Sequence, residues 1–124
     1  MFLEKHMVEK YTIEIESGIT FVNFNIAPSD KDIEVLLAHL AKQNIYERRL
    51  FNLGDLKFDI PASELESIAK VGKNLFQRPN KGALVATQDI SFGTGSQLGV
   101  YSSEDQNQFS VFRKKEKALS WLMR

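Results

Sequence analysis

The chain alternates short apolar runs of strand length with longer runs that have helical features. Four apolar runs are distinct, at residues 22–26, 50–53, 83–87 and 109–112, and a helix can be placed after each of them. Such alternation is typical of βα units around a mostly parallel sheet, because the connection between two parallel strands has to cross over the sheet. The alternation therefore predicts an α/β fold.

The residues before these runs predict a β-hairpin. Apolar and polar side chains alternate over residues 11–16, which is typical of a half-buried strand. Ser17-Gly18 then offers a two-residue turn in which the glycine permits a positive φ, and the next strand begins near Thr20. We expect a five-stranded mixed sheet, built from one antiparallel edge strand and four βα units with right-handed crossovers.

Capping residues predict where the first two helices begin. Ser29 or Asp30 can cap the first helix. Asp59 can cap the second helix with Pro61 in its first turn, and residues 63–66 offer an alternative capping box.

The last two helices differ in how clearly they are signalled. Residues 89–103 contain three glycines and only loosely periodic apolar positions, so we expect one short helix with an irregular start. The final helix has an apolar face of Ala118, Leu119, Trp121 and Leu122, on which Trp121 is expected to be largely buried against the sheet.

Length and composition limit the possible classes of protein. The 124 residues suit one domain, which we place at residues 11–124 after an N-terminal extension of residues 1–10. Sixteen basic and sixteen acidic residues cancel, whereas a nucleic-acid-binding protein is expected to carry a basic excess. Cysteine is absent, which excludes disulfides and thiolate chemistry. Neither a signal peptide nor an integral membrane segment is expected, so we expect a cytoplasmic protein.

The least ordinary residues converge on one edge of the expected sheet. In open α/β sheets, ligands bind near the loops at the carboxyl ends of the parallel strands. The candidate ligand- or partner-binding residues in these loops are Asp55, Phe58, Asp59, Phe92, Gly93, Gly95 and Lys114.

Each of these candidates also has a structural explanation. Turn and capping roles account for both aspartates, and Phe58 reads as an exposed loop aromatic. The Gly93-x-Gly95 pair fits a turn better than a phosphate loop, because no Walker lysine accompanies it. The histidines, His6 and His39, form no metal-ligand spacing. We therefore expect no catalytic residue, metal or cofactor.

The end of the chain carries a family resemblance. Its motifs are Phe109-Ser110-Val111-Phe112-Arg113 and Ala118-Leu119-Ser120-Trp121-Leu122, and they are joined by Arg49–Leu53, Gly82–Ala86 and Phe92-Gly93. With these packing motifs, residues 11–124 resemble the SpoIIAA-like, or STAS/SEC14-type, family of small bacterial domains. The resemblance implies a SpoIIAA-like fold and a non-enzymatic cytoplasmic interaction or regulatory module. Its partner would be another protein. Self-association as a homodimer is also expected, because two-fold dimers are the commonest oligomers and a near-zero net charge does little to oppose contact. Residues 11–26 and 89–103 are the expected contact surfaces.

The SEC14 side of the resemblance implies an alternative, a carrier of a lipid or a small apolar ligand. A carrier would need a cavity of about 300 Å³ or more, lined by residues such as Phe92, Leu98 and Tyr101. Family members that act as anti-sigma-factor antagonists have a phosphorylated serine in an Asp-Ser-Ser-Gly motif. Residues 59–62 of this chain read Asp-Ile-Pro-Ala, so we expect no phosphoserine switch. The arginine that tends to follow the Phe-Gly pair in the family is also replaced, by residues 95–97.

Overall fold

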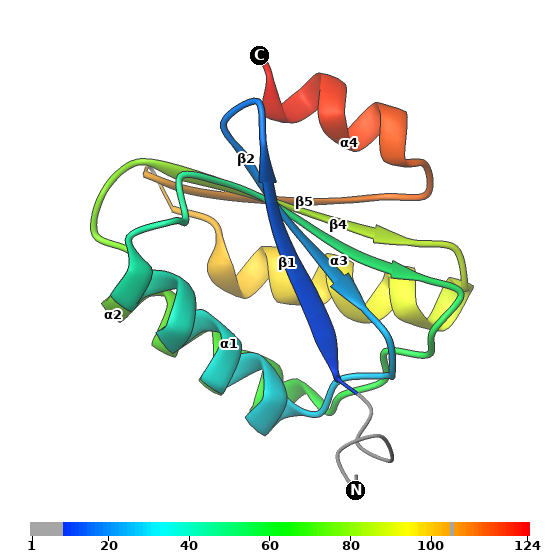
Figure 1. The fold of residues 1–124 in the computed structure, drawn as a ribbon. Helices are drawn as coiled ribbons and strands as arrows, with labels where there is room; N and C mark the ends of the chain where they lie inside the picture. Colours follow the sequence, from blue (N-terminus) through cyan, green and yellow to red (C-terminus); the bar gives the residue numbers. More distant parts are fainter. Residues whose placement is uncertain (1–8, 105) are drawn as a thin grey trace, which may run out of the picture.

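The computed structural model describes residues 9–104 and 106–124, so most of the expected N-terminal extension lies outside the described residues. The described residues form five strands and four helices (Figure 1). In chain order these elements are β1 (Tyr11–Glu16), β2 (Ile19–Phe24), α1 (Asp30–Gln43), β3 (Arg48–Gly54), α2 (Ala62–Leu75), β4 (Asn80–Ala86), α3 (Asp89–Ser102), β5 (Asn107–Phe112) and α4 (Lys115–Leu122).

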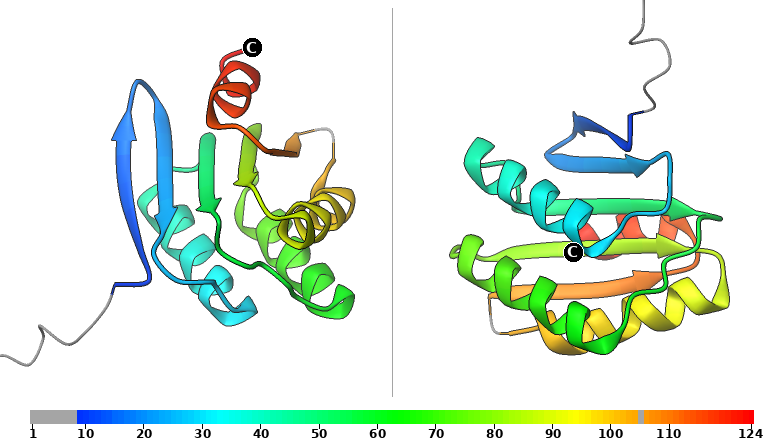
Figure 2. Two further views of the ribbon diagram at one scale, coloured as in Figure 1. Left: turned by 90° about the vertical axis from the view of Figure 1, so that its right-hand side faces the viewer. Right: turned by 90° about the horizontal axis from the view of Figure 1, so that it is seen from below.

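The strands form one mixed sheet in the order β1-β2-β3-β4-β5. β1 pairs with β2 in antiparallel fashion, and the other three pairings are parallel. Each of α1, α2 and α3 connects two neighbouring parallel strands, and the three helices lie together on one face of the sheet (Figures 1 and 2). α4 follows the last strand and packs on the opposite face against β3, β4 and β5. The expected α/β fold with a five-stranded mixed sheet is confirmed.

The expected hairpin is also confirmed, and its two-residue turn has a positive φ at the serine as well as at the glycine. Both Ser17 (φ 54°) and Gly18 (φ 77°) have positive φ. Positive φ at both central residues is the geometry that matches the twist of two antiparallel strands. The hairpin places β1 at the edge of the sheet.

The start of α1 is as predicted, and the start of α2 is not. Ser29 caps α1: its hydroxyl accepts from the Asp32 amide at 3.1 Å, and the Asp32 carboxylate accepts from the Ser29 amide at 3.0 Å. α2 instead begins after Pro61, which makes no side-chain cap bond. Residues 56–61 have no regular secondary structure. Phe58 and Ile60 are buried there, whereas the intervening Asp59 is exposed and does not cap the helix.

The prediction of a short, irregular helix over residues 89–103 is wrong, because α3 is a continuous helix of 14 residues. Two of its glycines, Gly95 and Gly99, allow close packing on the sheet. A Cβ atom on Gly95 would lie 2.5 Å from Leu84 Cδ2, and one on Gly99 would lie 3.3 Å from Phe109 Cδ1. This packing outweighs the low helix propensity of glycine, which costs about 1 kcal/mol per residue.

The core has two parts, one on each face of the sheet. The larger part lies between the sheet and the layer of α1, α2 and α3. The smaller part includes Leu50, Ala83 and Val85 from the sheet and Ala118 and Leu122 from α4. Trp121, expected to be largely buried, is only partly buried, because it packs at the edge of this smaller cluster. Its ring centroid lies 5.7 Å from that of Phe112. None of the helices in the described residues is long and apolar enough to cross a membrane.

Candidate functional site

The residues predicted at the carboxyl edge of the sheet do not form one site. Phe58, expected to be exposed, is buried at 2% exposure, so that expectation is wrong. Its amide donates a hydrogen bond to Ser91 Oγ at 2.7 Å, and Ser91 Oγ donates to the Leu56 carbonyl at 2.9 Å. These bonds hold the loop after β3 against α3, with the Phe58 ring turned into the larger core.

The two aspartates lie at the surface and serve the loops. The Asp55 carboxylate accepts a hydrogen bond from the Thr87 hydroxyl, and the Asp55 carbonyl accepts one from Gln88 Nε2 at 2.6 Å. Asp55 therefore ties the loop after β3 to the segment between β4 and α3. Asp59 is exposed.

The expected glycine turn lies inside α3. Gly93 is exposed, whereas Gly95 faces the sheet, so this pair forms neither a turn nor a phosphate loop. Phe92 lies under Arg113, whose Cζ is 4.3 Å from the ring centroid. Arg113 Nη1 also lies 2.8 Å from Asp89 Oδ1, so these residues join β5 to the start of α3. Lys114 is exposed at the start of α4.

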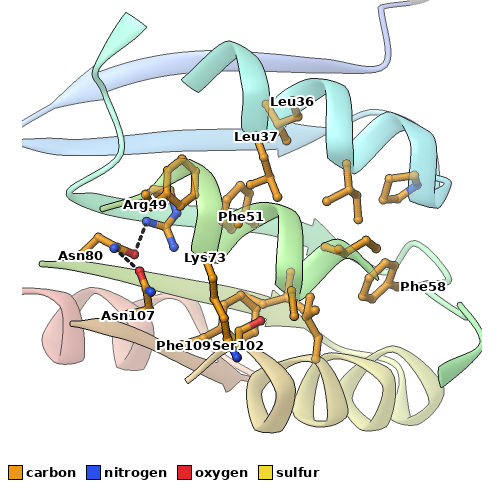
Figure 3. A pocket seen from close by; sticks show the side chains of 18 of the residues that line it. Leu36, Leu37, Arg49, Phe51, Phe58, Lys73, Asn80, Ser102, Asn107 and Phe109 are labelled. Atoms are coloured by element: carbon orange, nitrogen blue, oxygen red, sulfur yellow. Dashed lines mark hydrogen bonds between the residues drawn. The ribbon is translucent and has the colours of Figure 1, made fainter. Parts of the chain in front are cut away.

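A cavity of about 80 Å³ lies instead between the sheet and the layer of α1, α2 and α3 (Figure 3). Its walls are mostly apolar. The apolar side chains that line it include Phe24, Ile33, Leu36, Leu37, Phe51, Leu53, Phe58, Ile68, Ala69, Phe76, Leu84, Leu98 and Phe109. Phe58 is the one predicted site residue in the lining, and Leu98 is the one residue shared with the expected carrier cavity. Phe92 and Tyr101 do not line it.

A buried arginine stands at one end of this cavity, opposite Phe58 (Figure 3). Arg49 is only 5% exposed. It pairs with Gly82, which in turn pairs with Phe109, across three neighbouring strands. A Cβ atom on Gly82 would collide with Arg49 Nη2, so the absence of a side chain there makes room for the guanidinium.

The guanidinium is held from one side. Its Nη1 donates to the Tyr46 carbonyl at 2.6 Å and to Asn80 Oδ1 at 2.8 Å. The Phe76 ring lies beside it, with Cζ 4.7 Å from the ring centroid, and Phe51 lies at 5.7 Å. Arg49 Nε is buried without a hydrogen-bond partner among the described residues. An orphaned donor of this kind is unusual, because nearly all buried polar atoms in folded proteins are paired.

Two asparagines complete the polar end of the cavity. Asn80 and Asn107 pair across β4 and β5, and the Asn80 amide nitrogen donates to Asn107 Oδ1 and to the Arg78 carbonyl. Each asparagine is buried. The two hydrogen bonds of the Asn80 amide nitrogen orient Asn80 Oδ1 toward Arg49.

The charge of Arg49 is not balanced by a carboxylate among the described residues. Burial lowers the pKa of the Arg49 guanidinium from its usual value to about 9, and the nearby Tyr46 opposes this shift. The group is therefore still protonated at neutral pH. The other cation in the lining, Lys73, has its Nζ 3.3 Å from Glu104 Oε1 at the surface. Arg49 is thus a buried cation whose charge is offset by amide and carbonyl dipoles and by aromatic rings.

The sequence contains a signal for this site in the pattern of β3. Arg49, Phe51 and Leu53 alternate along β3, so all three point to the same face of the sheet. Phe51 and Leu53 are core residues, and a charged residue in register with them is therefore directed into the core as well.

This arrangement can accommodate a small apolar group and can offer it one positively charged donor. The polar lining residues are Arg49, Lys73, Asn80, Ser102, Asn107 and Gln108, so neither a carboxylate nor an imidazole lines this cavity. The described residues also contain no group of three His, Cys, Asp or Glu side chains that could hold a metal ion. No protein-family model matches the chain, and neither curated proteins nor solved structures give a significant match.

Proposed function

We propose that this chain is a non-enzymatic, SpoIIAA-like domain that binds a small apolar ligand in the cavity between its sheet and the layer of α1, α2 and α3. The observation that carries the proposal is the cavity itself. Protein interiors are normally packed to crystal-like density with few voids larger than a water molecule, whereas this core leaves about 80 Å³ between mostly apolar walls.

The size of the cavity favours a small ligand over a whole lipid. The volume is well below the roughly 300 Å³ at which typical ligand pockets begin. An apolar cavity of about 150 Å³ accepts benzene, so 80 Å³ corresponds to a group of only a few carbon atoms. The ligand that suits this space is a short, compact molecule or the branched end of a longer one.

A binding role is favoured over catalysis by the polar groups at the cavity. Hydrolytic and acid-base chemistry needs a base near a nucleophile or a pair of carboxyl groups. The polar lining here consists of cations, amides and one serine hydroxyl, Ser102. Such groups can orient and hold a ligand.

The interaction module implied by the family resemblance would need a different feature, an exposed apolar patch. The large exposed apolar side chains are spread over several elements: Ile15 on β1, Ile26 after β2, Val35 on α1, Ile90 and Val100 on α3, and Met123 after α4. Ile15, Ile26, Ile90 and Val100 lie on the two segments expected to mediate self-association. The homodimer therefore stays a prediction, secondary to ligand binding.

The test uses isobutyramide, a compact neutral probe, and a cavity-filling variant. We expect isobutyramide to shift the methyl NMR signals of lining residues such as Leu36 and Leu84 in a saturable way. Ala69→Leu adds an isopropyl group to a buried lining residue of α2 and should abolish these shifts. Ala62→Leu makes the same change at an exposed position of the same helix and should leave them intact.

Two results would contradict the proposed function. One is the absence of saturable shifts in the wild-type protein. The other is a set of shifts that survives unchanged in Ala69→Leu, because the probe would then bind outside the cavity.

A further inference from the structure

The end of the cavity at Arg49 suggests the chemical class of its ligand. Arg49 combines three features: it lines an apolar cavity, it is 5% exposed, and its Nε has no hydrogen-bond partner among the described residues. A buried charge without an opposite charge is costly, because the low dielectric of the interior disfavours it. Such a group calls for a counter-charge, and the described part of the chain does not supply one there.

We infer that the ligand of this cavity carries a carboxylate, which binds the guanidinium of Arg49 while its apolar part fills the cavity. This inference rests on the proposed function, since it names the class of molecule that the cavity takes: a short, compact carboxylic acid in its ionised form.

The hydrogen bonds of Arg49 leave one edge of the guanidinium for such a ligand. Both bonds that the structure shows come from Nη1, to the Tyr46 carbonyl and to Asn80 Oδ1. A guanidinium binds a carboxylate through two parallel N–H donors in a fork. Nε and Nη2 form one such fork, and Nη1, which is already engaged, is not part of it.

The surroundings of Arg49 favour a singly charged anion. Phe76 and Phe51 border the guanidinium, and no acidic side chain is paired with it in the described part of the chain. One carboxylate neutralises one guanidinium, whereas a phosphate dianion would leave an excess negative charge in an apolar site. Lys73, the other cation of the lining, is already paired with Glu104 at the surface.

The residues around Arg49 also hold its guanidinium in a defined position. Gly82 makes room for Nη2, and the asparagine pair Asn80–Asn107 fixes the acceptor that Nη1 uses. The guanidinium is thereby positioned before a ligand arrives, and preorganisation of this kind reduces the entropic cost of binding.

The experiment compares isobutyrate with isobutyramide, which has the same shape without the charge, at pH 7. We expect wild-type protein to bind isobutyrate about 10- to 100-fold more tightly, because hydrogen bonds to charged groups contribute about 1.5–3 kcal/mol. Affinities are measured by NMR titration of the methyl signals. Arg49→Met should remove this preference, so that the acid and the amide bind with equal affinity.

A matched control lies next to Arg49 in the chain. Arg48 is exposed at the start of β3 and points to the other face of the sheet, so Arg48→Met makes the same change of charge away from the cavity. It should leave the preference for isobutyrate intact. If Arg49→Met does not fold, the comparison of the two probes on wild-type protein still decides the question.

The outcomes separate this inference from the proposed function. Equal binding of the acid and the amide would overturn the inference and leave the proposed function standing. Binding of neither probe would overturn both. A preference for the acid that is lost in Arg48→Met and kept in Arg49→Met would overturn the inference by placing the anion outside the cavity.

Discussion

The two ends of the parallel strands differ in how they use polar residues. At the carboxyl ends, Asp55, Asp59 and Lys114 are exposed to solvent. At the amino ends, Arg49, Asn80 and Asn107 are buried, and Arg49 Nε has no hydrogen-bond partner in the described part of the chain. The carboxyl edge has more of the residues that usually suggest a site, whereas the amino end holds the buried cation on which the proposed ligand site rests. Burial of a polar group without a partner is the observation from which that site is proposed.

The largest effect that we expect is a difference in stability between variants of the neighbouring residues Phe58 and Asp59. Phe58→Ala removes a buried ring from the larger core and should lower the free energy of unfolding by about 3–5 kcal/mol. Asp59→Ala alters an exposed side chain and should change it by no more than about 0.5 kcal/mol. Urea denaturation of both variants measures the two values. A cost below about 1 kcal/mol for Phe58→Ala would show that the loop after β3 is not part of the core.

The pH dependence of isobutyrate binding tests whether the buried Arg49 binds the carboxylate. Only the protonated guanidinium attracts the carboxylate, and the pKa of Arg49 in the ligand-free protein is about 9. Affinity should therefore be constant from neutral pH to about pH 8.5 and then fall about tenfold for each further pH unit, until the raised pKa of the bound state is reached. Isobutyramide should show no such fall.

Other ionisable groups near this end of the cavity are Tyr46, which stacks on Phe76, Lys73 with its partner Glu104, and Arg78, which lies over Tyr46. Lys73→Met therefore serves as a control. A fall in isobutyrate affinity that disappears in Lys73→Met would assign the titration to the surface lysine rather than to Arg49.

The smallest expected effects have opposite signs at two glycines of α3. Gly95→Ala places a methyl group against Leu84 and Val111 and should cost about 1–3 kcal/mol of stability through overpacking. Gly93→Ala adds the same methyl group to an exposed helical position with open space around it. It should stabilise the protein by about 0.5–1 kcal/mol. Thermal unfolding of the two variants measures the sign of each change in stability. Equal effects at the two positions would mean that α3 is not packed closely on the sheet.

Much of the fold could be predicted because its signals are local. The alternation of residues 11–16 predicts an edge strand, Ser17-Gly18 predicts the turn, and Ser29 predicts the start of α1. In each case the physical cause lies within a few residues of the chain: the period of side chains along a strand, the φ angles of a tight turn, or a hydroxyl within reach of a free amide.

The failures of prediction share a non-local cause. α3 was expected to be irregular because its glycines are poor helix formers, yet Leu84 and Val111 from the sheet require small residues there. Asp59 was expected to cap α2, yet the burial of Phe58 and Ile60 turns it away from the helix. In both cases contacts between distant segments outweighed the local preference.

The order of the strands and helices along the chain, the hairpin and the apolar faces of the core can be derived from the sequence, because they follow from side-chain periodicity and local hydrogen bonds. Which polar residues meet inside that core depends on the tertiary structure. Arg49, Asn80 and Asn107 come from three different strands, and the register of the parallel sheet brings them to one end of a cavity. Periodicity along one segment carries no information on register between segments, so this site became visible only once the strands were paired.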